Sequence, residues 1–236
     1  MRNLELVQTS KPFLSFLEAW VSDLPTLSLT EFAAEPQNTA IVSVDVINGF
    51  CVSGALASPR VAGIVDPIVN LFKQSWSIGV DKIILVQDTH EPDAVEFQSW
   101  PPHCVRGTAE AETVAEFKQL PFYDRMVTFE KNSIHAGQNT GLNEWISQHP
   151  TVDHFIVVGD CTDLCTYQLA MHLLLEGGAR QVKRRVIVPE NCVETYDRTV
   201  ETAQEQGGFP HPADLMHAVF LYHMALNGVE VVRSLT

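Results

Sequence analysis

Short apolar runs alternate with longer helical patterns from residue 39 onward. Runs of strand length, rich in β-branched residues, predict strands at 40–45, 82–88, 126–131, 155–158, 186–189 and 229–232. Helical periodicity predicts helices at 61–77, 109–118, 141–148, 162–176, 193–206 and 215–227. Strands separated by helices are typical of βαβ units, in which the strands run parallel and the helices cover the sheet. We therefore expect one α/β domain over residues 39–236, a three-layer α/β/α sandwich with a mostly parallel sheet.

Residues 1–38 have a different pattern. Apolar side chains recur at helical spacing over 13–20, which predicts a short amphipathic helix. The segments 28–32 and 36–38 have the composition of a connecting loop. We interpret residues 1–38 as an N-terminal arm that packs on the domain or on a neighbouring subunit.

The composition is that of a globular protein, with 45% hydrophobic and 19% charged residues. A net charge of −14 excludes a nucleic-acid partner, because phosphates require a basic face, and suits a small neutral or cationic ligand. No stretch resembles a secretory signal, and no apolar run approaches the roughly 20 residues that span a bilayer. The five cysteines are an odd number, which favours reduced thiols. We expect a cytoplasmic protein without a membrane partner.

Reactive residue types occur where several predicted strands end. Asp45, Asp88 and Lys131 each close a different strand, and the turn over 161–165 follows a fourth. Ligands of open parallel sheets bind beyond the carboxyl ends of the strands. This convergence predicts an active site at that edge of the sheet.

Cys165 is the candidate nucleophile. It follows the predicted strand 155–158 at the start of a helix that Thr162 or Asp163 could cap. The partial positive charge of a helix N-terminus favours a thiolate. The alternative is a small buried cysteine of the core, which is the commoner role of an isolated free cysteine.

Asp45 and Lys131 could activate that cysteine. A partly desolvated carboxylate can take the thiol proton, and a nearby ammonium stabilises both thiolate and carboxylate. The alternative is an ordinary ion pair at the sheet edge. Backbone N–H groups of the turn, at Cys161 and Cys165, could hold the oxyanion of an acyl intermediate. The side chain of Cys161 is expected to be structural, because the C-x3-C spacing is not that of a redox or zinc motif.

The loop over 87–103 carries a candidate metal site. Asp88 and His90 are two residues apart, so both can face one side of an extended segment, and His103 or Glu96 could join them. Imidazoles and a carboxylate suit a divalent metal such as zinc, iron or manganese. The alternative is a loop with scattered polar residues.

Five segments together resemble the isochorismatase-like cysteine hydrolases and, among them, the nicotinamidases. They are 44–51 (VDVINGFC), 87–90 (QDTH), 100–108 (WPPHCVRGT), 130–131 (EK) and 159–165 (GDCTDLC). The resemblance covers roughly residues 39–234, and the W-P-P-H-C stretch is similar to the metal-binding nicotinamidase branch.

The resemblance implies a Rossmann-like sheet and specific roles for these residues. It implies a catalytic triad of Cys165, Asp45 and Lys131, and metal ligation by Asp88, His90 and His103, with Glu96 as a further carboxylate ligand in some members. It also implies that Phe50 and Trp100 flank a pyridine ring and that the Asp160–Cys161 peptide is cis. The sequence departs from the family pattern at Asp160 and Cys161, which replace a small apolar pair and bring a charge and a thiol beside the oxyanion hole. The arm is also longer than in minimal members.

The expected function is metal-dependent conversion of nicotinamide to nicotinate and ammonia through a thioester, as in NAD salvage. The cofactor would be one divalent metal ion, with zinc expected first, the partner a small-molecule amide, and the assembly a homo-oligomer. One alternative is a related amidohydrolase acting on a carbamoyl or ureido substrate, whose family members generally lack the metal loop. The other is a non-catalytic binding protein on the same scaffold.

Overall fold

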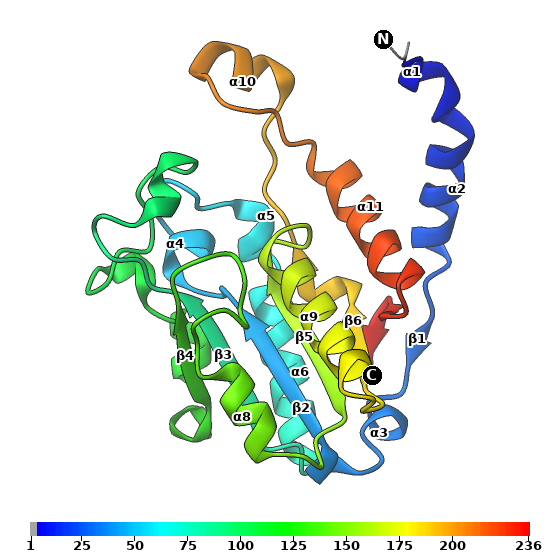
Figure 1. Cartoon of the computed structure of the whole chain (residues 1–236), viewed down its shortest axis with the longest axis vertical. Coiled ribbons are helices and arrows are strands. Elements are labelled where there is room, and N and C mark those ends of the chain that lie inside the picture. The colour runs from blue at the N-terminus through cyan, green and yellow to red at the C-terminus, as the bar shows by residue number, and fades with distance from the viewer. Residues whose placement is uncertain (1–3) are drawn as a thin grey trace.

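A parallel sheet forms the centre of the protein in the computed structural model, which describes residues 4–236 (Figure 1). The strand order is β4-β3-β2-β5-β6-β8, and β7 pairs with the end of β5. Every pairing in this sheet is parallel, as predicted. The strands are β2 (Thr39–Val44), β3 (Lys82–Asp88), β4 (Val127–Lys131), β5 (His154–Asp160), β6 (Arg185–Pro189), β7 (Val193–Glu194) and β8 (Glu230–Val232).

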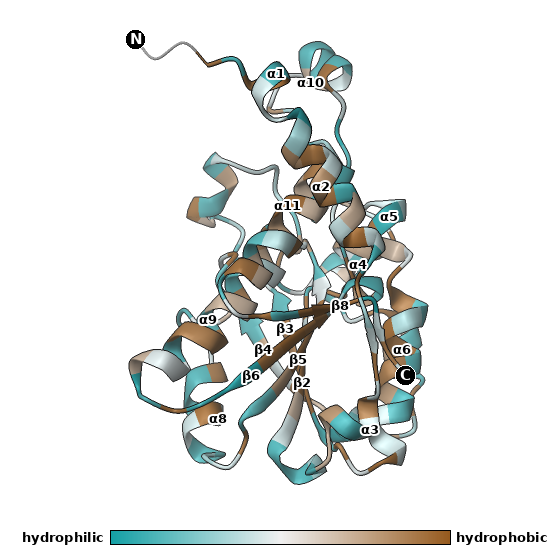
Figure 2. Cartoon of the chain, turned by 90° about the vertical axis from the view of Figure 1, so that its right-hand side faces the viewer, coloured by the Kyte–Doolittle hydropathy of each residue, from teal (hydrophilic) through white to brown (hydrophobic). Residues whose placement is uncertain are grey.

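Alternate residues of the strands build two apolar cores. Ile41 of β2 faces the core that contains α6 (Val65–Ser77) and α7 (Ala115–Lys118). Val42 faces the other core, which contains α8 (Leu142–Gln148), α9 (Cys165–Ala179) and α11 (Ala213–Leu226). Successive strand side chains point to opposite faces, so an almost wholly apolar strand requires cover on both sides. Figure 2 shows the brown strands between α8 and α9 on one side and α6 on the other, which confirms the predicted three-layer α/β/α sandwich.

The N-terminal arm packs on its own domain. The predicted helix is present as α2 (Lys11–Ser22), and its aromatic side chains lie edge-on around Tyr222 of α11, with ring centroids 5.4 to 5.7 Å away. The prediction of a loop over 28–32 was wrong, because Ser28 caps a helical turn by accepting from the Glu31 N–H at 3.2 Å. The other arm elements are α1 (Leu6–Thr9), β1 (Thr26–Leu27), α3 (Leu29–Phe32) and a 3-10 turn (Pro36–Asn38). Residues 1–3 of the predicted arm lie outside the described part, and its boundary at residue 38 stays a prediction.

Three predicted helices differ from the structure. The pattern at 61–77 is divided into α5 (Pro59–Ala62) and α6, and that at 109–118 into a 3-10 turn and α7. The prediction at 193–206 was wrong over its first half: its start pairs with β5 as β7, and a helix begins only after Thr199, whose side chain caps it. Tertiary pairing with β5 overrides the local periodicity there. The remaining elements are α4 (Asn48–Cys51), α10 (Val200–Gln206), β9 (Ser234–Leu235, paired with β1) and 3-10 turns at Val95–Gln98, Ala109–Ala111, Tyr123–Arg125 and Glu190–Cys192.

Across residues 4–236, none of the helices is both long enough and apolar enough to cross a membrane.

Candidate active site

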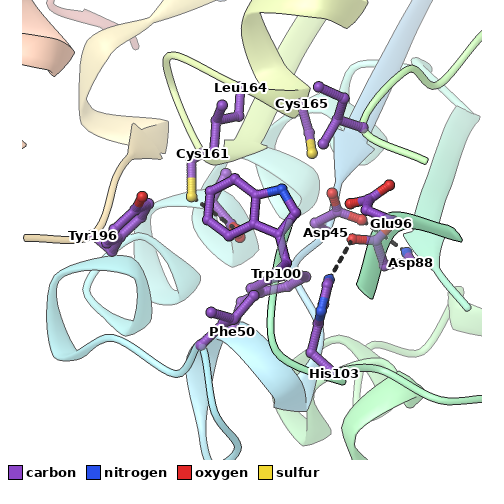
Figure 3. Close-up of a pocket in the computed structure, with 13 residues that line it drawn as sticks. Asp45, Phe50, Asp88, Glu96, Trp100, His103, Cys161, Leu164, Cys165 and Tyr196 are labelled. Atoms are coloured by element: carbon purple, nitrogen blue, oxygen red, sulfur yellow. Dashed lines mark hydrogen bonds and ion pairs between the residues drawn. The ribbon is translucent and has the colours of Figure 1, made fainter. Parts of the chain in front are cut away.

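A pocket opens at the carboxyl edge of the sheet (Figure 3). Eight of the ten side chains singled out from the sequence line it, while Lys131 and His90 are buried beside it. The edge therefore brings together residues that are up to 120 positions apart in the chain, from Asp45 to Cys165. The lining residues are Asp45, Phe50, Leu56, Asp88, Glu96, Trp100, His103, Ile134, Asp160, Cys161, Leu164, Cys165 and Tyr196.

Asp45 leaves β2 in an uncommon backbone conformation. Its φ is 60°, in the left-handed region, where a short polar side chain is better tolerated than a bulky or β-branched one. The backbone is held by a bond from the Asp45 N–H to the Val86 carbonyl (3.0 Å), and Asp45 Oδ1 accepts from the Asp88 N–H (2.8 Å). The carboxyl group is thereby fixed between β2 and β3.

Asp45, Asp88 and Lys131 form a buried group that we call the charged cluster. Lys131 Nζ lies 2.8 Å from Asp45 Oδ2 and also pairs with Asp88 Oδ1. The same ammonium lies 3.6 Å from Cys165 Sγ, to which it can donate. All four residues are no more than 6% exposed. The three residues of the predicted triad therefore lie together, with the Lys131 ammonium in contact with both the Asp45 carboxyl group and the Cys165 thiol.

Burial and neighbouring charges set different pKa values in this cluster. Burial, assisted by the Asp88 charge and opposed by Lys131, raises the pKa of Asp45 to about 6. For Asp88 the effect of burial is outweighed by the Lys131 ammonium and the two histidines, which hold its pKa below the usual range. Burial alone would lower the pKa of Lys131, but the two carboxylates raise it well above its ordinary value. At neutral pH Lys131 is an ammonium, and Asp45 has the proton affinity of a general base.

Cys165 is the first residue of α9, and its thiol points toward Asp45 (Figure 3). Burial raises the pKa of the Cys165 thiol, and the Lys131 ammonium opposes that effect. The expectation that the helix N-terminus favours a resting thiolate is therefore wrong: a base must take the proton. The predicted caps are also wrong, because Leu164 occupies the N-cap position without a side-chain bond. The Thr162 and Asp163 side chains face α11 and its flanking loop instead.

The turn before Cys165 leaves two backbone donors free. Within residues 4–236, neither the Cys161 N–H nor the Cys165 N–H donates to another backbone group. The Asp160–Cys161 peptide is cis, as the resemblance implied. Gly159 precedes it at φ 117° with the Val44 backbone directly against it, so any side chain there would collide with β2. The turn is thus suited to bind an oxyanion between the two cysteine N–H groups.

Asp88, His90 and His103 form a candidate metal centre. One ligand atom from each lies within 4.8 Å of the others. His90 Nδ1 donates to Asn132 Oδ1 (2.7 Å) and His103 Nδ1 donates to the Pro101 carbonyl (2.8 Å). Each bond occupies Nδ1, so Nε2 is the ring nitrogen that lies toward Asp88 and that a neutral ring would offer to a metal.

The environment of the His90 Nε2 atom supports a metal at this position. It is buried without a hydrogen-bond partner in the described structure, which is costly for a polar atom unless something else binds it. Two imidazoles and one carboxylate fit zinc, iron or manganese. Glu96 lines the pocket but lies outside this three-residue group, so it stays a predicted further ligand.

Aromatic rings form the rest of the wall. Phe50 lies 5.7 Å from the His103 ring, and Trp100 meets Tyr196 edge-on at 6.4 Å. Tyr196 in turn stacks on His211 at 4.0 Å. Tyr196 was missed in the sequence, because its segment reads as a helix and a single tyrosine carries no signal.

A buried polar network supports the turn over 161–165 that leads to Cys165. This network was also missed in the sequence. Asp163 accepts from Thr195 Oγ1 (2.6 Å) and pairs with His211 Nε2 (2.7 Å), and Thr162 Oγ1 lies 2.8 Å from His217 Nδ1. These bonds attach the turn to the segment that leads into α11. The only sequence signal was a pair of polar residues in the turn, and that suited a helix cap equally well.

Comparison with known proteins gives consistent matches. A family model described as the isochorismatase domain matches residues 39–217. "Nicotinamidase 1" of Arabidopsis thaliana is 29% identical over 220 residues, covering 84% of this chain and 87% of the relative.

Solved structures share the fold. A cysteine hydrolase from Pseudomonas syringae pv. phaseolicola superposes with a TM-score of 0.69 at 22% identity, covering 85% of this chain and 90% of that one. The pyrazinamidase of Pyrococcus horikoshii in complex with zinc gives a TM-score of 0.64 at 21% identity, covering 83% and 99%.

Proposed function

The chain belongs to the isochorismatase family, and we propose that it is a metal-dependent cysteine amidohydrolase that converts nicotinamide to nicotinate and ammonia. One observation carries the proposal: Lys131 Nζ, buried beside the pocket, lies 2.8 Å from Asp45 Oδ2 and 3.6 Å from Cys165 Sγ, and both of these residues line the pocket. The matched nicotinamidase relative supports the choice of nicotinamide. The reaction would return nicotinamide to NAD synthesis.

The pocket can position a flat aromatic amide. Phe50 and Trp100 offer apolar ring faces, and the carboxamide would then lie over Cys165. Asp88, His90 and His103 would hold the divalent metal, with zinc expected first, and when bound it supplies a Lewis acid for the pyridine nitrogen. The Nδ1 bonds to Asn132 and Pro101 keep the two imidazoles oriented for that role.

Acylation follows from the positions of the triad. Asp45 takes the proton of the Cys165 thiol, and the sulfur attacks the amide carbon to form a C–S bond. The oxyanion receives hydrogen bonds from the Cys161 and Cys165 N–H groups. Asp45 then gives its proton to the amide nitrogen, the C–N bond breaks, and ammonia leaves a thioester on Cys165.

Hydrolysis of the thioester uses the same groups. Asp45, again a carboxylate, takes a proton from water, and the hydroxide attacks the thioester carbon. The C–S bond breaks, the sulfur recovers a proton from Asp45, and nicotinic acid leaves and loses its proton to water as nicotinate. Lys131 stays an ammonium throughout and stabilises the negative charge as it moves between sulfur and carboxylate.

Ammonia release from nicotinamide tests the proposal. We expect turnover by the wild type, loss of turnover on treatment with a chelator and recovery on addition of zinc. Cys165→Ala should lower kcat on the order of 10⁴-fold or more while metal content per chain is unchanged. Substantial turnover by Cys165→Ala would contradict the proposal.

A panel of carbamoyl and ureido compounds separates the alternative substrate class. The metal group at Asp88, His90 and His103 favours nicotinamide, since the carbamoyl-cleaving relatives are expected to lack it. A metal-free protein that is fully active on a ureido compound and inactive on nicotinamide would support the alternative.

A further inference from the structure

Asp160 is a third buried carboxyl group in the pocket lining, beside Asp45 and Asp88, and the triad does not use it. It ends β5, lines the pocket and is 1% exposed. Its Oδ2 atom is buried and has no hydrogen-bond partner in the part of the chain that the structure describes. Because β2 lies between β5 and β3, Asp160 and the candidate metal ligand Asp88 are on opposite sides of Asp45.

The surroundings of Asp160 require a neutral carboxyl group. Asp45 and Asp88 share the Lys131 ammonium, but no ion pair is formed by Asp160 among residues 4–236. A buried carboxylate without a cation is far costlier than a buried carboxylic acid. Burial, with the nearby Asp45 charge, accordingly raises the pKa of Asp160 well above its ordinary value, although the Lys131 ammonium opposes the shift.

The neighbouring thiol determines which oxygen carries the proton. Cys161 Sγ donates to Asp160 Oδ1 at 3.8 Å, and burial raises the pKa of the Cys161 thiol, so its proton stays on sulfur. Oδ1 is therefore the carbonyl oxygen, and Oδ2 is the hydroxyl. That hydroxyl is a buried donor without an acceptor, which is costly unless a bound ligand accepts its hydrogen bond.

We propose that Asp160 is a specificity-determining residue: its Oδ2 hydroxyl donates to an acceptor atom on the substrate, so the site selects heteroaromatic amides that carry a second polar group. This inference rests on the proposed amidohydrolase function. The amide would lie over Cys165, the ring nitrogen toward Asp88, and the additional hydroxyl, oxo or ring-nitrogen acceptor toward β5.

The test is a ratio of kcat/KM values. The numerator is the best substrate among the ring-hydroxylated nicotinamides, and the denominator is nicotinamide. We expect this ratio to fall at least about tenfold in Asp160→Val, because a buried hydrogen bond is lost. It should stay within about threefold in Asp160→Asn, whose amide group also donates. Asp163→Asn is the matched control, since Asp163 is a buried aspartate of the same turn outside the pocket lining, and it should leave the ratio unchanged.

Two results would overturn the inference: an unchanged ratio in Asp160→Val, or an equal fall in Asp163→Asn. If Asp160→Val does not fold, infrared difference spectra of wild type against Asp160→Asn decide the question. We expect the carbonyl band of a protonated acid at neutral pH, shifted when a hydroxynicotinamide binds, and its absence would overturn the inference. If no amide releases ammonia but this band still shifts on binding, the proposed function fails and the role of Asp160 stands.

Discussion

The two halves of the pocket floor handle buried acids in opposite ways. Under the β2–β3–β4 half, Asp45 and Asp88 share one ammonium, and Asp88 stays ionised. On the β5 half, Asp160 has a thiol as its neighbour, and burial raises its pKa well above the ordinary value. All three aspartates occupy the ends of parallel strands, so the position alone does not determine the charge.

The difference assigns different kinds of chemistry to the two halves. A carboxyl group with a pKa near 6 beside an ammonium can exchange protons with a thiol at neutral pH. A carboxyl group that keeps its proton can only present a fixed donor and acceptor. The charged cluster is thus suited to catalysis. The turn that follows β5, with Asp160 at its start, is suited to holding the oxyanion and recognising the substrate.

Removal of the shared ammonium should have the largest effect on stability. Lys131→Met leaves two buried carboxylates without a cation, and we expect the free energy of unfolding at pH 7 to fall by about 3–5 kcal/mol. Urea unfolding measures the change. The matched control is Lys118→Met, which removes an exposed pair with Glu112 and should have no measurable effect. A loss in Lys131→Met no larger than in the control would contradict the account of the cluster.

The Asp163–His211 pair should give a smaller, pH-dependent effect. His211 has a raised pKa because Asp163 outweighs the effect of burial, so its stabilisation is full below about pH 6.5 and is lost as the pH rises through the folded pKa. Asp163 has a lowered pKa because His211 and Thr195 outweigh burial, so its stabilisation is lost as the pH falls below about 4. His211→Gln should therefore cost about 1.5–3 kcal/mol near pH 5 and less at pH 9. Thermal or urea unfolding measures the difference in stability between the wild type and His211→Gln across this range. A difference that does not change with pH would contradict an ionic pair.

Replacement of Asp160 should stabilise the protein at neutral pH, whereas replacement of Lys131 or His211 should destabilise it. Its folded pKa lies above the unfolded one, so the native state binds more protons and loses stability as the pH rises from about 4 toward the folded pKa. Asp160→Asn removes that loss. We expect the variant to match the wild type at pH 4 and to be more stable at pH 7. A variant that is less stable at pH 7 would indicate that Asp160 is ionised and paired.

Sequence patterns correctly predicted the sheet and the clustering of the reactive residues at one of its edges. Parallel strands place their carboxyl ends at one edge, so residues that close different strands meet there whatever their separation in the chain. That argument located Asp45, Asp88, Lys131 and Cys165, and their catalytic roles stay predictions.

The features that were missed or predicted wrongly depend on tertiary contacts, which hydrophobic periodicity does not reveal. The pairing of Val193–Glu194 with β5 turns an apparent helix into a strand and brings Tyr196 to the pocket. The contact between Asp163 and His211 joins residues 48 positions apart and removes a predicted helix cap. The raised pKa of Cys165 follows from burial in the folded pocket, whereas its place at a helix start suggested the reverse.

Trapping the acyl-enzyme tests the central claim most directly. Wild-type protein mixed with nicotinamide, quenched in acid during turnover and analysed by peptide mass spectrometry should carry a nicotinoyl group on the peptide that contains Cys165. The same peptide from Cys165→Ala should carry none, and the peptides with Cys51, Cys104 and Cys192 should be unmodified. Turnover of nicotinamide with no adduct on Cys165, or with an adduct on another cysteine, would contradict the assignment of Cys165 as the nucleophile.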